Sequence, residues 1–183
     1  LLSDRPDLAA EDLLGLPMGV TAELREGGQR HFSGLVTRFG TGRAMGTRFG
    51  YQATVRPWLW FLTRTSDCRI FQEQTVREIV EAVFADHPAI ANFEFKLFRS
   101  YRPRVYCVQY RETDFNFVAR LLEDEGIYWY FVHDEKGHKL MLVDDVGAHA
   151  PVAGYETLPY YANAGQVPPD TEYIGQWNFS REV

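Results

Sequence analysis

Residues 106–131, YCVQYRETDFNFVARLLEDEGIYWYF, predict a strand, a helix and a second strand in direct succession. Thr113 is a good N-cap, and Asp114 places a negative charge in the first turn, where the helix dipole favours it. Gly126 can end the helix because glycine adopts a positive φ without steric cost. One helical face carries the apolar residues Phe115, Val118, Leu121 and Leu122. We therefore expect a helix over 114–124, packed through this face against a barrel.

The strands on either side of this helix are expected at 105–110 and 127–132. Both contain apolar residues at successive positions, VYCVQY and IYWYFV. Strands that are apolar on both sides are typical of sheets covered on both faces. We therefore expect both faces of these two strands to be buried.

The acids of this stretch are the first candidates for a catalytic or metal-binding set. Groups that chelate a metal ion or transfer a proton must point at one spot, whereas consecutive acids in a last helical turn fan around the helix. Acids there meet the negative end of the dipole, so we expect a partner such as an arginine from another strand. We interpret the whole set as structural, with Glu123 and Asp124 exposed; it comprises Glu112, Asp114, Glu123, Asp124 and Glu125.

The residues before this stretch predict further strands. Alternating apolar residues over 17–39 indicate a hairpin that turns at EGGQ, residues 26–29. The glycine-rich stretch GTGRAMGTRFG, residues 40–50, lacks the Lys-Ser/Thr and the following helix of a phosphate-binding loop. We interpret it as a flexible hairpin tip, with phosphate binding as the alternative. Residues 51–63 predict another strand, in which Pro57 marks an edge, a bulge or a break.

A second helix is predicted over 75–86. Val76, Ile79, Val80 and Val83 recur with helical spacing. Thr75 and Glu78 form the pattern of a capping box, and Pro88 blocks further helix. A short strand is expected at 93–98.

The chain after the central stretch predicts a hairpin and then a long connection. Residues 127–132 turn through HDEKGHK and return as LMLVDD, residues 140–145. His133 and His138 flank this turn and could bind a metal ion with Asp144 or Asp145. They lack a known ligand spacing, so we favour a solvated turn. Residues 147–170 indicate a surface connection, and TEYIGQWNFS, residues 171–180, a final strand.

Composition narrows the classes of function. The formal net charge of −6 argues against nucleic-acid binding, which needs a basic face. No apolar run approaches the roughly 20 residues that a membrane-spanning helix needs. Two cysteines, Cys68 and Cys107, and the absence of a signal peptide favour a reduced protein made in the cytosol over one with a disulfide. The chain begins without Met, and both ends suggest a piece of a longer protein.

No enzyme motif is visible in the sequence. The five serines, at 3, 33, 66, 100 and 180, lie outside any G-x-S-x-G elbow. Neither cysteine has a histidine partner by motif, and zinc-protease, Walker A and dinucleotide signatures are absent. Carboxylates that pair only in space remain an open alternative. From the residues alone we expect a mainly β protein with two helices.

Several stretches together resemble the base domain of the VgrG spike proteins of type VI secretion systems and the related hubs of contractile phage baseplates. They are HFSGLVTRF at 31–39, YQATVRPWLWFLT at 51–63, CRIFQEQTVREIVEAVF at 68–84, the opening stretch at 106–131, and HKLMLVDD at 138–145. Cys68 stands where the family often has serine, which suits a structural position. Asp124 is a further departure without an evident role.

The resemblance implies an architecture and a set of partners. The fold is expected to be mainly β (α+β), with two β-barrel-like modules of the phage tail hub type and a helical insertion. The expected boundaries are a partial first module at 1–66, the insertion and connector at 67–104, and a partial second module at 105–183. The implied partners are two further copies in a homotrimer, the hexameric inner-tube protein, baseplate components and secreted effectors.

The resemblance also implies a mechanical role. It predicts no catalytic, metal or cofactor site, and a protein made in the bacterial cytoplasm, assembled into the injection apparatus and expelled without a signal peptide. The alternatives are a baseplate hub of a contractile-tailed phage or prophage and, further away, a hydrolase with an unrecognised carboxylate or metal site.

Overall fold

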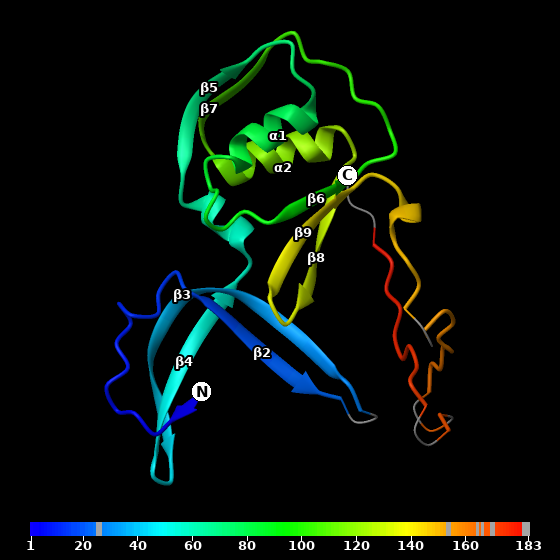
Figure 1. Ribbon diagram of the computed structural model, residues 1–183. Helices are drawn as coiled ribbons and strands as arrows, with labels where there is room; N and C mark the ends of the chain where they lie inside the picture. Colours follow the sequence, from blue (N-terminus) through cyan, green and yellow to red (C-terminus); the bar gives the residue numbers. More distant parts are fainter. Residues whose placement is uncertain (25–26, 153–154, 164, 166, 169–170, 181–183) are drawn as a thin grey trace. The chain divides into compact units, whose positions relative to one another are not determined.

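The computed structural model describes residues 1–24, 27–152, 155–163, 165, 167–168 and 171–180. The chain divides into two units, Leu1–Asp145 and Val146–Val183. Strands and two short α-helices make up the first unit (Figure 1). Among the described residues, no helix is long and apolar enough to cross a membrane.

The N-terminal sheet has four antiparallel strands in the order β1-β4-β3-β2. The predicted hairpin over 17–39 is confirmed, because β2 and β3 pair from Pro17↔Leu35 to Glu23↔Gln29. Glu26, in the predicted turn, lies outside the described residues. The strands are β1 (Leu2–Ser3), β2 (Pro17–Glu23), β3 (Gln29–Met45) and β4 (Arg48–Arg56).

The glycine-rich stretch 40–50 is a hairpin, as expected, but most of it is strand instead of a flexible tip. β3 continues to Met45, β4 begins at Arg48, and only residues 46–47 form the turn. Gly50 is required by close packing, since a Cβ atom built there would lie 1.9 Å from the Arg43 carbonyl oxygen. Paired backbone on both sides of a two-residue turn leaves no loop to surround a phosphate.

The predicted strand over 51–63 is correct only as far as Arg56. Pro57 breaks it, and Trp58–Thr63 form the 3₁₀ helix η1. Proline has no N–H with which to continue a ladder, and the helical turns direct Trp58, Leu59 and Leu62 into the core. The Trp58 indole N–H donates to the Asn92 carbonyl oxygen at 3.0 Å, which satisfies its one polar group.

Both predicted α-helices are present, as α1 (Val76–Phe84) and α2 (Asp114–Asp124). The capping box of α1 is confirmed, with Glu78 N–H donating to Thr75 Oγ1 and Thr75 N–H donating to the Glu78 carboxylate. In α2, Asn116 N–H donates to Thr113 Oγ1, as expected of an N-cap. The predicted conformation of Gly126 is also confirmed by a φ of 66°.

Two small sheets surround the helices (Figure 1). β5 (Ser66–Phe71) pairs with β7 (Cys107–Thr113), and a second sheet has the order β6-β9-β8. Its strands are β6 (Phe93–Lys96), β8 (Tyr128–Asp134) and β9 (Gly137–Val143). The main core lies where these elements meet, and its fully buried side chains include Trp58, Ile79, Phe84, Phe117, Leu121, Leu140 and Leu142.

The expectation that β7 and β8 are buried on both faces is wrong for this chain. Cys107 and Gln109 of β7 are buried, but Tyr110 is 64% exposed. Tyr128 and Val132 of β8 are also exposed. Among the described residues of the first unit, no helix or strand covers the outer face of the β5–β7 ribbon. The inner face of the ribbon lies against the core.

The second unit contains little regular structure in its described residues. It has the 3₁₀ turn η2 (Val146–Ala148) and one parallel bridge between Tyr160 and Ile174. The predicted final strand over 171–180 is therefore wrong, because only Ile174 makes a bridge there. Alternating apolar residues without a neighbouring strand to bond do not suffice to form one.

Candidate functional site

Asp114, one of the five acids considered as a catalytic or metal-binding set, lies at the centre of a buried polar network. Its carboxylate accepts hydrogen bonds from Thr65 Oγ1 at 2.6 Å, Gln109 Nε2 at 2.8 Å and Arg69 Nη2 at 2.6 Å. The Asp114 residue is 4% exposed and Gln109 is fully buried. The network connects β5, β7 and the first turn of α2, so its clearest role is to hold these three elements together.

Electrostatics support this structural interpretation of Asp114. Burial by itself raises the pKa of its carboxyl, but hydrogen bonds from Gln109 and Thr65 and the charge of Arg69 hold the pKa below the usual value. The group therefore stays ionised at neutral pH. Both carboxylate oxygens already accept hydrogen bonds, which leaves a proton or a substrate little access to them.

Sequence reasoning missed the partners of Asp114. Arg69 also donates to Gln109 Oε1 and forms an ion pair with Asp86. Arg69 lies opposite Gln109 in the register of β5 and β7, a pairing that no local pattern in the sequence indicates.

The acids at the end of α2 have the arginine partner that their position requires. Arg104 Nη2 donates to Asp124 Oδ2 and, at 2.7 Å, to Glu125 Oε1. Arg99 Nη2 donates to the carbonyl oxygens of Glu125 and Gly126 at 2.8 and 3.1 Å. Both arginines come from the connector between β6 and β7, whereas we had expected the partner to come from another strand. Positive charge thus meets the negative end of the helix dipole, and Glu123 and Asp124 are exposed as predicted.

Glu112 also has a structural partner. Its carboxylate accepts three hydrogen bonds from Arg120 at 2.6–3.1 Å, and Arg120 Nη2 donates further to the Val108 carbonyl oxygen. The five acids of the opening stretch therefore do not converge on a single point. Four of them belong to three separate contacts, and Glu123 is exposed.

The four residues considered for a metal site do not form one. Asp144 accepts hydrogen bonds from the backbone N–H groups of Phe98 and Arg99 and from the Tyr101 hydroxyl, at 2.7–3.2 Å. Burial raises its pKa, but these donors outweigh burial and lower the pKa to about 2. Asp145 accepts from Tyr128 Oη through its backbone carbonyl. In the described part of the chain, no group of three or more His, Cys, Asp or Glu side chains could hold a metal ion.

The two histidines lie on facing positions of β8 and β9, with ring centroids 5.9 Å apart. Each accepts a backbone hydrogen bond: His133 Nδ1 from Ser33 N–H at 3.1 Å, and His138 Nε2 from Trp58 N–H at 2.8 Å. The expected solvated turn is thus partly wrong, because both rings are engaged with other elements. Ser33 Oγ also lies 3.2 Å from His133 Nδ1, but this nitrogen already accepts an N–H and is poorly placed to take a hydroxyl proton.

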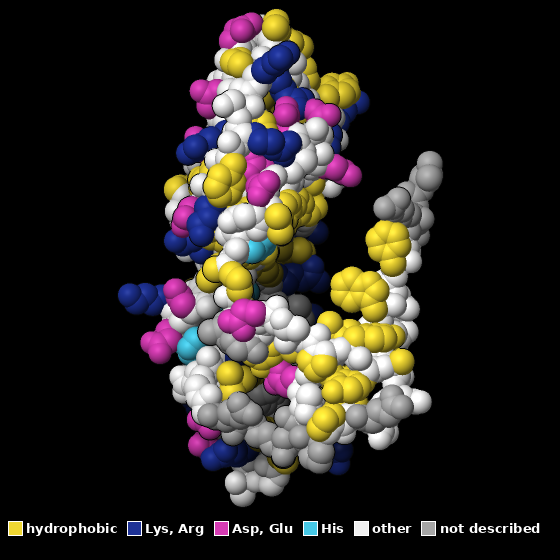
Figure 2. Space-filling view, turned by 90° about the vertical axis from the view of Figure 1, so that its right-hand side faces the viewer, with side chains coloured by type: hydrophobic (Ala, Val, Ile, Leu, Met, Phe, Trp, Pro, Cys, Tyr) yellow, Lys and Arg dark blue, Asp and Glu magenta, His cyan; other side chains and the backbone are white. Residues whose placement is uncertain are grey.

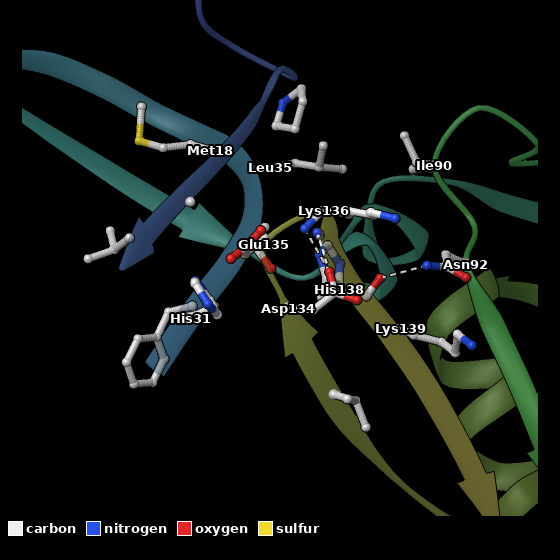
Figure 3. Close-up of a pocket in the computed structure, with 18 of the residues that line it drawn as sticks. Met18, His31, Leu35, Ile90, Asn92, Asp134, Glu135, Lys136, His138 and Lys139 are labelled. Atoms are coloured by element: carbon white, nitrogen blue, oxygen red, sulfur yellow. Dashed lines mark hydrogen bonds between the residues drawn. The ribbon is translucent and has the colours of Figure 1, made fainter. Parts of the chain in front are cut away.

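An open groove of about 1060 Å³ lies beside His138, between β2 and β3 on one side and β6, β9 and the β8–β9 turn on the other (Figure 3). Several of its polar groups are already paired. Asn92 Nδ2 donates to the His138 carbonyl oxygen, Lys139 pairs with Glu94, and Asp134 accepts from the turn backbone. Its labelled lining mixes apolar Met18, Leu35 and Ile90 with charges of both signs.

Two remaining features are the cysteines and the distribution of surface charge. Cys68 is free and exposed, and Cys107 is free and buried, with burial raising the pKa of its thiol. On the face seen in Figure 2, Lys and Arg side chains are interspersed with Asp and Glu side chains. A nucleic-acid-binding face gathers positive charge instead.

Comparison with known proteins identifies the class. The chain belongs to the phage tail baseplate hub (GPD) family, whose match covers residues 1–183. A solved E. coli structure, the c3393 protein, superimposes with a TM-score of 0.69 and 28% identity over 87% of this chain and 43% of its own. That protein is described as a component of the type VI secretion system, similar in structure to the T4 bacteriophage tail proteins gp27 and gp5.

Within the family, the similarity is to VgrG spike proteins, so the resemblance inferred from the motifs is confirmed. The type VI secretion system spike proteins VgrG1c and VgrG1a of Pseudomonas aeruginosa are 48% and 47% identical to it over the whole of this chain. The chain spans about a quarter of their length, 25% and 28%. A tail protein of Neisseria meningitidis, at 14% identity and a TM-score of 0.54 over 74% of this chain and 42% of its own, shares the fold.

Proposed function

We propose that the chain is the structural hub, or base, of a VgrG spike at the tip of a type VI secretion apparatus. In this proposal it docks the spike on the hexameric inner tube, and the spike carries effectors out of the cell. The observation that carries the proposal is the near-half identity to VgrG spike proteins over the entire chain. The first candidate acids agree with it, because Asp114, Asp124 and Glu112 are used in contacts that stabilise the fold.

The exposed apolar side chains of the first unit support a role in assembly. Ile70 and Tyr110 lie on paired strands, 61% and 64% exposed, on the outer face of the β5–β7 ribbon. Large exposed apolar groups that cluster on one face are typical of surfaces that contact other proteins. The proposal assigns such contacts to other copies in a homotrimer, to the tube and to baseplate components.

The proposed architecture is a pair of β-barrel-like modules, at 1–66 and 105–183, with an insertion at 67–104. The four-stranded β1–β4 sheet lies within the first range, and α1 and β6 within the insertion. Three copies would form a ring of pseudo-sixfold symmetry that suits a hexameric tube. This function requires no catalytic residue, metal ion or cofactor, and it places the protein first in the bacterial cytoplasm and then in the expelled spike.

A baseplate hub of a contractile phage or prophage is the second candidate. It is favoured by the family match, which is to a phage tail hub, and the fold alone serves both machines. Neighbouring genes distinguish the two: sheath and tube genes beside effector genes support secretion, whereas head and capsid genes support a phage.

The oligomeric state of the full-length protein that contains this chain tests the hub proposal. Size-exclusion chromatography with light scattering should give a trimer. The Asp124→Asn variant, which changes an exposed side chain, should still co-purify with the tube protein from the same gene cluster. If the β5–β7 face makes contacts in the assembly, the double variant Ile70→Asp, Tyr110→Asp should no longer co-purify with it. A protein that stays monomeric at high concentration would contradict the proposal.

A further inference from the structure

The β8–β9 hairpin is held to neighbouring elements by two histidines that both act as hydrogen-bond acceptors. His133 Nδ1 accepts from the backbone N–H of Ser33 on β3, and His138 Nε2 accepts from the backbone N–H of Trp58 at the start of η1. A backbone N–H cannot accept a hydrogen bond in return. Each ring must therefore be neutral, with its proton on the other nitrogen.

Protonation converts both acceptor nitrogens into donors. An imidazolium has an N–H on each ring nitrogen, so a protonated His138 would point one at the N–H of Trp58. A protonated His133 would have the Ser33 hydroxyl oxygen, 3.2 Å from Nδ1, as an acceptor, so the mismatch falls on His138. Protonating both rings would also place two positive charges on facing residues whose centroids are 5.9 Å apart. Both effects act against the closed hairpin and neither acts against an open one.

The surrounding charges do not reverse this preference. The titratable and charged groups that line the two hollows beside the pair come from β3, β6, β9 and the hairpin turn; they are Arg30, His31, Glu94, Lys96, Asp134, Glu135, Lys136 and Lys139. Glu94 pairs with Lys139, and Asp134 accepts from the backbone N–H groups of Lys136 and Gly137. Burial, and then the neighbouring His133, lower the pKa of His138, which agrees with a site that disfavours the imidazolium.

We propose that His138, with His133 facing it, forms an acid-sensitive latch, which holds the β8–β9 hairpin on η1 at neutral pH and releases it as the pH falls. The released hairpin would widen the groove of Figure 3, whose wall includes His138 and the turn residues Asp134 and Lys136. This inference is independent of the proposed hub function, since it depends only on contacts within the first unit.

Linkage sets the direction and the steepness of the effect. A histidine whose pKa is lowered by folding contributes its full stability above its ordinary pKa of 6.5 and loses it as the pH falls toward the folded value. If only the open hairpin binds the proton of His138, the opening equilibrium rises about tenfold for each pH unit below roughly 6.5.

Hydrogen–deuterium exchange measured between pH 7.5 and 5.0, and expressed as protection factors, tests the latch. In the wild type, protection of the Ser33 and Trp58 amides should fall steeply below pH 6.5, while residues 48–54 of β4 stay protected. His133→Asn and His138→Gln place an amide oxygen near the positions of Nδ1 and Nε2 and cannot titrate. The double variant should match the wild type at pH 7.5 and stay flat on acidification.

Two controls make the outcome decisive. His149→Gln, at an exposed position of the second unit, should keep the wild-type pH profile. If the double variant does not fold, His138→Gln alone should flatten the pH profile of the Trp58 amide. Wild-type protection that is unchanged down to pH 5.0, or a double variant that loses protection as the wild type does, would overturn the latch.

Discussion

Replacing Asp114 by Asn should destabilise the protein far more than replacing Asp124 by Asn. The Asp114 side chain is 6% exposed and pairs with Arg69, whose side chain is 19% exposed, whereas the Asp124 side chain is 65% exposed. Breaking one partner of a buried ion pair costs about 3–5 kcal/mol. Because Arg69 keeps its contacts with Asp86 and Gln109, we expect a loss of about 3 kcal/mol. An exposed pair is worth at most about 1 kcal/mol.

Urea unfolding followed by circular dichroism at pH 7 measures the free energy of unfolding of the wild type, Asp114→Asn and Asp124→Asn under the same conditions. The folded state lowers the pKa of Asp114 below 3.8, so its stabilising contribution is present above pH 3.8 and disappears as the pH falls through the lower folded value. The gap between wild type and Asp114→Asn should therefore shrink below about pH 4.

A double-mutant cycle separates the ion pair from packing. Arg69→Met should cost less in the Asp114→Asn background than in the wild type, because residues in one network couple in their effects on stability. The reasoning is refuted if Asp114→Asn costs no more than Asp124→Asn, or if the two changes at Asp114 and Arg69 simply add.

Two further substitutions probe the end of α2. Gly126→Val should lower the free energy of unfolding by about 1–3 kcal/mol, because a β-branched residue is strained at positive φ and its Cβ would lie 3.3 Å from Arg99 Nη2. The control is Gly40→Val, where a Cβ meets nothing within 4 Å. Equal thermal unfolding midpoints for the two variants would contradict the argument. Glu123→Gln together with Asp124→Asn should change the free energy of unfolding by no more than about 1 kcal/mol, since both side chains are exposed. The double variant should also leave assembly and secretion intact. Loss of secretion by a folded double variant would show that these acids do have a function.

Local sequence signals determined the helices and their ends. The capping box of α1, the N-cap of α2, the apolar spacing and the glycine at the end of α2 are all properties of residues within four or five positions of each other. This explains why Thr75, Thr113 and Gly126 have the predicted roles. The same signals indicated that three consecutive acids fan around the helix, but Asp124 and Glu125 meet at Arg104 Nη2, which only the tertiary structure shows.

Tertiary structure decided what each polar side chain meets. Asp114 lies 45 residues from Arg69, and His133 lies 100 residues from Ser33, so no local pattern reveals either pair. The apolar run after Pro57 predicted a strand, although such a run suits a helical turn equally. The structure has the 3₁₀ helix η1 there, which buries Trp58. Burial of both faces of β7 was inferred from composition alone, but a face is covered only if another element or another chain lies against it, and the described unit supplies none for Tyr110.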